Sequence, residues 1–327
     1  MGETTMGGLF GGVDIGATKL HAVIATADGK VLARARKKSK GKKGFDVVMQ
    51  RVAAVLEKAC SEANVAIGDL EAVGVGAPSP IRPDGTAVNA TNLGWSDAAL
   101  AASLMKCIPR PVVAENDCNL GTLGEFVYGV GQGSQSLVGL FVGTGLGGGI
   151  VLGGEMVRGP HHLAAEVGHM IIEAKGRKCG CGHIGCLEAY ASKTGMGNRL
   201  RTEIEKNGRF SLLQEEEGLD LRNVRSGILA RVYAAGDEVV REAVGEVAWY
   251  LGLGVANLIT LLGPEVIVLG GGVLEALGEE MLDSIRKSAK AATFPEVAFG
   301  DVKLVLSELG DDAVALGAIA YARSQLS

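Results

Sequence analysis

A cysteine-rich stretch has the most specific spacing for chemistry in this 327-residue chain. Four residues follow the pattern H-x9-C-x-C-x4-C: His169, Cys179, Cys181 and Cys186. Thiolates and imidazole are the ligands that tetrahedral zinc prefers, and four protein ligands leave no open position on the metal. A redox pair would more commonly show C-x-x-C spacing beside a βαβ unit. The stretch therefore predicts a structural zinc site.

Two glutamates flank this predicted zinc loop. Glu166 precedes His169, and Glu188 follows Cys186. A loop fixed by zinc would present both carboxylates to a ligand. The alternative, that each glutamate is a solvated helix end or a salt-bridge partner, stays open on these residues alone.

Two glycine turns form the second group of candidate residues. "VDIGATKLHAVI" and "FVGTGLGGGIVL" both place a glycine and a threonine between two apolar strands. The second formally matches G-x-G-x-x-G, but that motif must open a helix, and the apolar "GIVLGG" that follows is typical of a strand. Bare backbone amides in such turns can cradle phosphate oxygens, although the glycines could also serve only tight turns.

The residues expected at these phosphate turns are Gly16, Thr18, Gly143, Thr144 and Gly145. Asp14 and Lys19 flank the first turn. We expect Asp14 to hold Mg²⁺ through water, because a metal ion that bridges terminal phosphates neutralises their charge.

The elements that must position these residues repeat along the chain. Residues 8–38 read as three short strands, a helical apolar pattern follows at 48–59, and "LEAVGVGAP" reads as a buried strand. The second cycle starts at "SLVGLFVGTGLGGGIVLGG", continues to the buried strand "PEVIVLGGGV" and ends in a helix. The sequence thus predicts a duplicated α/β unit, with a small lobe at 1–117, a large lobe at 118–310 and a final helix at about 311–327 that returns to the first lobe.

Composition restricts the possible partners. With 32 basic and 37 acidic residues, the chain is mildly acidic, so we expect no nucleic-acid partner. The apolar stretch 247–263 is shorter than a spanning helix and reads as a buried helix, so no membrane is expected. The chain opens with no recognisable signal peptide, and the scattered cysteines suit reduced cytoplasmic thiols. The basic segment 34–43 reads as a solvated loop, with a polyanion such as polyphosphate as the alternative.

Together these motifs resemble the ROK family of sugar kinases and repressors, and most closely its bacterial glucokinases. The matching segments, in family order, are "VDIGATK", "ENDCNLGTLGE", "VGTGLGGGIV", "AEVGH", "CGCGHIGCLE" and "EVIVLGGGV". The resemblance implies the ribonuclease-H-like fold of the actin and hexokinase superfamily, with two lobes and an interlobe cleft. It also implies an enzyme that uses ATP and Mg²⁺ and carries structural Zn²⁺.

The resemblance further assigns roles to single residues. Asp117 would be the general base that takes a proton from the sugar hydroxyl as it attacks the γ-phosphate. The expected sugar-binding residues are Asn92, Asn116, Asp117, Glu166, His169 and Glu188. His169 would bind zinc through one ring nitrogen and the sugar through the other. Gly271 and Gly272 would pass close to the adenosine, and Asn116 or Asp117 could instead only cap the following helix.

The resulting expectation is ATP-dependent phosphorylation of glucose to glucose 6-phosphate. The alternatives are N-acetylglucosamine, mannose, fructose or allose as substrate, polyphosphate as donor, or a non-catalytic sugar sensor. Two residues depart from the family pattern: Ala17 replaces the glycine of "DIGGTK", and Ser79 replaces the glycine of "PGP". Ser79 leaves the preferred hexose open, because that loop approaches the sugar in relatives. A homodimer or homotetramer is expected from the resemblance.

Overall fold

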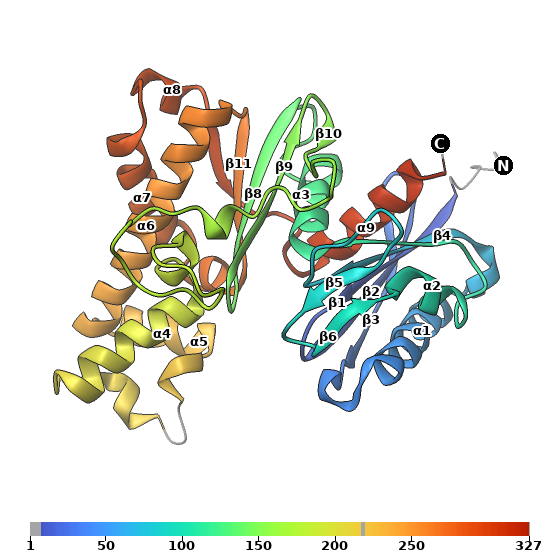
Figure 1. Ribbon diagram of the computed structural model, residues 1–327, viewed down its shortest axis with the longest axis horizontal. Coiled ribbons are helices and arrows are strands. Elements are labelled where there is room, and N and C mark those ends of the chain that lie inside the picture. The colour runs from blue at the N-terminus through green and yellow to red at the C-terminus, as the bar shows by residue number, and fades with distance from the viewer. Residues whose placement is uncertain (1–7, 217–219, 327) are drawn as a thin grey trace. The chain divides into compact units, whose positions relative to one another are not determined.

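The computed structural model describes residues 8–216 and 220–326 (Figure 1). The strands are β1 (Leu9–Ile15), β2 (Lys19–Thr26), β3 (Val31–Lys38), β4 (Leu70–Ala77), β5 (Ala87–Ala90), β6 (Trp95–Ala98), β7 (Val112–Asn116), β8 (Ser136–Val142), β9 (Leu146–Leu152), β10 (Glu155–Met156), β11 (Val266–Gly270) and β12 (Lys303–Leu306). The α-helices are α1 (Phe45–Glu62), α2 (Leu100–Met105), α3 (Asp117–Tyr128), α4 (Lys193–Arg201), α5 (Ser226–Ala234), α6 (Glu238–Leu262), α7 (Gly272–Ala292), α8 (Val297–Gly300) and α9 (Ala313–Ser324).

The two large sheets share one strand order. The first sheet runs β3-β2-β1-β4-β7, and the second runs β10-β9-β8-β11-β12. In the first, β1 pairs antiparallel with β2 and parallel with β4. In the second, β8 pairs in parallel with β11, which pairs in parallel with β12. This repeated order confirms the predicted duplication of an α/β unit.

The chain forms two compact units, which are described separately. Unit 1 runs up to Ser134 and also includes Gly149–Ala165 and the chain from Glu308 onward, whereas unit 2 contains Gln135–Gly148 and Glu166–Ser307. The C-terminal helix α9 thus groups with the N-terminal sheet. The lobe limits expected from the sequence, at 117 and 310, stay predictions.

Both faces of the first sheet are buried. Along β1, Val13 and Ile15 face a core that includes the apolar positions of α1, whereas Phe10 faces a second core built with α9. Since successive side chains of a strand point to opposite faces, Gly12 and Asp14 share the α9 face with Phe10. The strand that carries Asp14 is therefore covered by α9.

Glycines allow α9 to approach the neighbouring backbone closely. A Cβ atom at Gly12 would collide with the carbonyl oxygen of Ala315, and one at Gly317 would collide with that of Leu120 in α3. Glycine lacks this atom, so β1, α9 and α3 can pack at backbone contact. The close packing brings the end of β1 near the start of α3.

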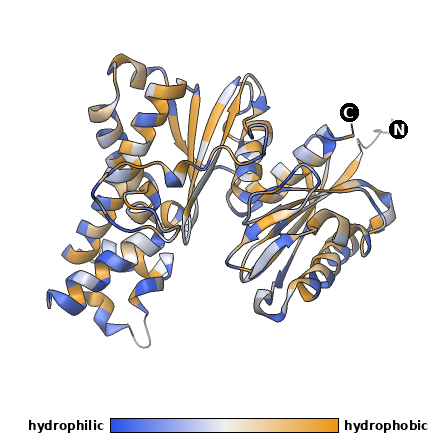
Figure 2. Cartoon of the chain, viewed as in Figure 1, coloured by the Kyte–Doolittle hydropathy of each residue, from blue (hydrophilic) through white to orange (hydrophobic). Residues whose placement is uncertain are grey.

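Helices α6 and α7 pack against each other in unit 2, and apolar residues fill the strands β8 and β11 beside them (Figure 2). By length and composition, α6 would qualify as a membrane span, but more than half of its apolar window is buried inside the fold. Val247, Leu251 and Val255 are among its buried residues. This agrees with the predicted buried helix.

Gly317→Ala should destabilise unit 1 by about 3 kcal/mol or more, because the added methyl group overlaps the backbone of α3. Gly68→Ala is the matched control, since no atom lies within 4 Å of its Cβ position. Urea unfolding can be followed by Trp95 fluorescence in a Trp249→Phe background, which reports unit 1 alone. Equal midpoints for the two alanine variants would contradict this account of the packing.

Candidate active site

The first glycine turn joins β1 to β2, and bonds on its carbonyl side hold it closed. The Gly16 amide donates to the Lys19 carbonyl at 2.9 Å. Ser39 then donates twice: its amide to the Thr18 carbonyl at 2.9 Å and its hydroxyl to the Ala17 carbonyl at 2.6 Å. Ala17 has no left-handed backbone conformation, so the turn accepts alanine where the family usually has glycine.

Two acidic residues lie close together on the α9 side of this unit. Asp14 is near the end of β1, and Asp117 begins α3. Burial, then repulsion by the Asp117 carboxylate, raises the pKa of Asp14 to about 7, with Lys19 opposing the shift. Burial also raises the pKa of Asp117, although the Cys118 amide donates to its Oδ1 at 2.9 Å. Two desolvated carboxylates near one another suit proton transfer and a divalent cation.

Lys19 is held in an ion-pair network with residues just before α9. Its Nζ lies 2.9 Å from Asp311 Oδ2, and Arg36 Nη2 lies 2.6 Å from the same oxygen. Arg34 pairs with the neighbouring Asp312 at 2.7 Å. Arg34 and Arg36 belong to β3, within the stretch predicted as the third strand, and they continue the pairing of β3 with β2; the loop reading of the basic segment 34–43 is therefore wrong for residues 34–38. Their charges are balanced within the fold.

Asn116 caps α3 and is oriented by the loop after β4. Its Oδ1 accepts hydrogen bonds from the amides of Cys118 and Asn119 at 2.9 and 3.0 Å. Its Nδ2 donates to the Ser79 carbonyl at 3.3 Å. An asparagine amide has two N–H donors, so one remains for a ligand. The buried Ser79 hydroxyl accepts from the Asn89 amide at 3.0 Å, which ties this loop to β5.

The second glycine turn joins β8 to β9 and is bound by the start of α4. The amide of Lys193 donates to the Gly143 carbonyl at 3.0 Å. Thr194 donates to the Thr144 carbonyl through its amide at 3.2 Å and its hydroxyl at 2.7 Å. The strand β9 follows the turn, which confirms that "GTGLGG" does not open a helix.

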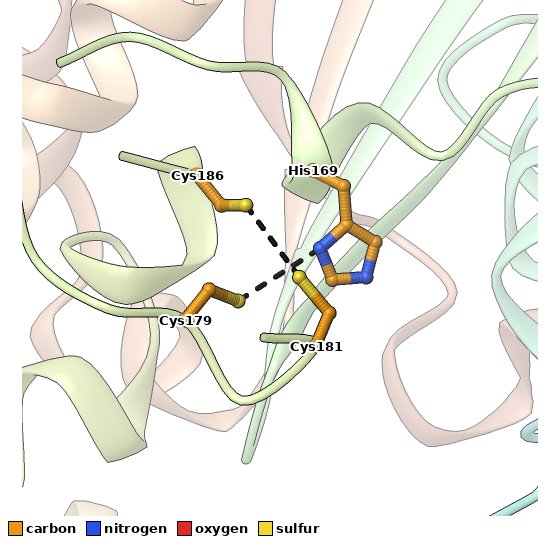
Figure 3. Close-up of side chains that lie close together, drawn as sticks. All are labelled: His169, Cys179, Cys181 and Cys186. Atoms are coloured by element: carbon orange, nitrogen blue, oxygen red, sulfur yellow. Dashed lines mark hydrogen bonds between the residues drawn. The ribbon is translucent and has the colours of Figure 1, made fainter. Parts of the chain in front are cut away.

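The four predicted zinc ligands converge in unit 2 (Figure 3). Their ligand atoms all lie within 4.8 Å of one another. Cys181 Sγ is 3.7 Å from Cys186 Sγ, and Cys179 Sγ is 3.9 Å from His169 Nδ1. A zinc tetrahedron with Zn–S bonds of about 2.3 Å has edges of about 3.8 Å, so the geometry and the donor set fit zinc. His169 turns Nδ1 toward the thiols and its other nitrogen away (Figure 3).

Two thiols of this cluster differ in acidity. Burial raises the pKa of Cys179 to about 12, whereas a hydrogen bond from the His183 backbone is the main cause that lowers the pKa of Cys181 to about 6. A cation would supply the charge needed to hold the buried sulfur as thiolate.

Glu188 connects the cysteine cluster to the second glycine turn. Its Oε2 accepts the Leu146 amide at 2.9 Å, and the Cys179 thiol lies 3.3 Å from its Oε1. Glu166 is exposed at the start of a 3-10 turn that carries His169, and its carbonyl accepts the His169 amide at 3.0 Å. Ala165, just before Glu166, has a φ of 68°, a left-handed conformation that costs a non-glycine residue about 1–2 kcal/mol.

Three further predicted binding residues, Gly271, Gly272 and Asn92, lie outside the groups described above. Gly271, with a φ of 99°, precedes α7 and lies against the carbonyl of Val142, next to the second turn. Gly272 is the first residue of α7. Asn92 is exposed between β5 and β6, and among the residues that the structure describes it makes no hydrogen bond to Asn116 or Asp117.

Sequence reasoning missed Ser39, Thr194 and Asp311 as partners of the predicted residues. Ser39 stands inside the basic segment, and Asp311 follows β12 at the far end of the chain. The one local signal was Ser192, a typical helix N-cap ahead of Thr194, whose hydroxyl accepts the Gly195 amide.

The ROK family model matches residues 10–325. Among curated proteins, a glucokinase from Halalkalibacterium halodurans is 35% identical over 312 residues, which cover 94% of this chain and 92% of that protein. A xylose repressor from Caldicellulosiruptor bescii is 30% identical and is matched over 96% of this chain and 78% of its own length.

Solved structures of this family show the same fold. A ROK family glucokinase from Streptomyces griseus, in complex with glucose and AMPPNP, superposes with a TM-score of 0.85 at 31% identity. The match covers 97% of this chain and 100% of that one. The fold is thus the two-lobed ribonuclease-H-like fold expected from the sequence.

Asp14→Asn should stabilise the protein more at pH 8 than at pH 5, and not at all below about pH 3.8. The folded-state pKa of Asp14, about 7, exceeds its ordinary 3.8, so stability falls as pH rises between these values. Asparagine removes this cost, and we expect a gain on the order of 1–2 kcal/mol after solvent screening. Urea unfolding at both pH values measures it. Asp84→Asn, at an exposed aspartate whose pKa is lowered, should show no gain at pH 8; a gain that does not depend on pH would contradict the assignment.

Proposed function

This chain belongs to the ROK family, and from that premise we propose that it transfers the γ-phosphoryl group of ATP to a hexose, converting glucose to glucose 6-phosphate. The observation that carries the proposal is the pair of desolvated carboxylates, Asp14 and Asp117, beside a glycine turn with free amides. The glucokinase relatives support glucose as the substrate.

In this proposal, Asp117 is the general base. Its carboxylate takes the proton of the sugar hydroxyl while that oxygen attacks the γ-phosphorus and ADP leaves. The raised pKa makes Asp117 a stronger base than an ordinary aspartate. Asp14 would hold Mg²⁺ through water, and the ion would neutralise charge on the transferring phosphates. Lys19, paired with Asp311, adds a cation beside the same turn.

Five side chains are proposed to hold the sugar hydroxyls with Asp117: Asn92, Asn116, Glu166, His169 and Glu188. Asn116 can offer its second N–H, since Ser79 fixes the first. His169 can offer Nε2, since Nδ1 faces the cysteines. For Glu188, the bond to the Leu146 amide fixes the carboxylate and ties hexose recognition to the second turn. Gly143, Thr144, Gly145, Gly271 and Gly272 are the proposed nucleotide contacts in unit 2.

Zinc is proposed for the four-residue cluster in a structural role. Three thiolates and one imidazole complete a tetrahedron, so the ion would brace the loop that ends in Glu188. No catalytic step is assigned to this metal.

A sugar-responsive regulator is the second candidate, because the xylose repressors share most of this chain. Binding alone needs no base, so the effect of Asp117 on turnover separates the two functions. Polyphosphate is less favoured as donor, since Asp311 and Asp312 already balance Arg34 and Arg36. The oligomeric state, the lack of a nucleic-acid partner and the cytoplasmic location stay predictions.

Asp117→Asn should lower kcat by about 10²–10⁴-fold and leave hexose affinity within a few fold of the wild type. A coupled assay measures turnover, with glucose, N-acetylglucosamine, mannose, fructose and allose offered in turn and ATP and polyphosphate tested separately. Calorimetry measures hexose binding, and Asp84→Asn is the control. Turnover by Asp117→Asn near the wild-type rate would refute the assigned base.

Elemental analysis should find one zinc ion per chain. Cys186→Ser should lose the ion and destabilise unit 2 by several kcal/mol, since metal affinity contributes directly to folding. Cys107→Ser is the control, because Cys107 is exposed and lies outside the cluster. Retention of zinc by the Cys186 variant, or metal-free wild-type protein after purification without chelator, would disprove the site.

A further inference from the structure

We infer that Ser39 and Thr194 are positioning residues for the phosphates of the donor nucleotide. Ser39 binds two carbonyls of the first glycine turn, Thr194 binds one carbonyl of the second, and each thereby keeps the amides of its turn facing outward. The inference rests on the proposed function, because it assumes that both turns receive phosphate oxygens.

The first turn shows the arrangement most completely. Ser39 directly follows β3 and is fully buried. Its hydroxyl and amide bind the carbonyls of Ala17 and Thr18 at 2.6 and 2.9 Å. The amides of Ala17 and Thr18 have no backbone acceptor within the described chain. The carbonyl groups of this turn are therefore hydrogen-bonded to Ser39, and its amide groups are available to a ligand.

The second turn has the same pattern with a residue from a different element. Thr194 lies in the first turn of α4, and both its hydroxyl and its amide bind the Thr144 carbonyl. Lys193 occupies the Gly143 carbonyl. The amides of Thr144 and Gly145 likewise have no backbone acceptor among the residues described.

The orientation of these peptides decides whether a turn attracts or repels phosphate. Successive amides that point to one side form an anion-binding nest, whereas a flipped peptide presents a carbonyl oxygen, which repels an anion. Glycine-containing turns resist such a flip poorly, because glycine accepts many backbone conformations. A hydroxyl that donates a hydrogen bond to a carbonyl of the turn opposes such a flip, because the flip would break that hydrogen bond.

The hydrogen bonds that hold the two turns come from residues at non-equivalent positions of the duplicated unit. Ser39 follows the third strand of its sheet, whereas Thr194 stands in a helix beyond the cysteine loop. The same bonding pattern thus arises from different positions. This favours a common functional requirement of both turns over a packing contact that was merely retained when the unit was duplicated.

Thr194→Val removes the hydroxyl and preserves the shape of an exposed side chain, whereas Thr194→Ser keeps the hydroxyl. We expect the valine variant to raise both the KM for ATP and the Kd for a non-hydrolysable ATP analogue by roughly three- to tenfold, and the serine variant to behave like the wild type. The KM for the hexose should not change. Ser39→Ala should show the same selective effect on the nucleotide.

Thr202→Val is the matched control, because the Thr202 hydroxyl also binds a backbone carbonyl, that of Asn198, away from the turn. Equal nucleotide affinity in Thr194→Val and Thr194→Ser would overturn the inference, as would an equal rise in the KM for the hexose. If the wild type binds the analogue but shows no hexose turnover, the proposed function fails, and the Kd comparison still decides the role of Thr194.

Discussion

The close packing of α9 against β1 and α3 is the constraint on which the chemistry of unit 1 depends. Gly12 and Gly317 let three backbones meet where any side chain would separate them. As a result, the acid at the end of β1 and the acid at the start of α3 share a desolvated environment, and the pKa values of both rise. The 3-10 turn Gly310–Asp312, just before α9, also supplies Asp311, which holds Lys19 beside the first turn. A helix from the end of the chain thus sets the electrostatics of its first strand.

In unit 2, hydrogen bonds between loops hold the candidate groups in place. The second glycine turn is bound by α4 on its carbonyl side, and Leu146, at the end of the turn, donates to Glu188. Glu188 in turn lies beside Cys179, so one carboxylate links the turn to the cysteine cluster. A metal ion in that cluster would stiffen the loop without taking part in catalysis. The proposed metal site, the proposed hexose contact Glu188 and the proposed phosphate turn therefore lie within a short chain of contacts.

Much of the fold follows from local pattern. Short apolar stretches separated by turn residues predict β1 and β2, apolar residues at helical spacing predict α1, and the repeated glycine turn predicts the duplicated sheet. For the basic segment, the predicted strand up to residue 38 was confirmed and the loop reading was wrong there, since Arg34 and Arg36 lie on β3. Both arginines pair with aspartates near the other end of the chain. Local charge density could not show these ion pairs, because the aspartate partners are distant in sequence.

By itself, the sequence determined the family, the strand and helix pattern and the four candidate metal ligands, because spacing and residue chemistry are local properties. Only the tertiary structure decided the pKa values of the candidate acids and the orientation of the candidate hydrogen-bonding groups. Burial and a neighbouring carboxylate raised the pKa of Asp14, Ser79 fixed one N–H of Asn116, and Ser39 and Thr194 set the direction of the turn amides. These effects depend on distance and desolvation between residues far apart in the chain, and no sequence spacing encodes either quantity.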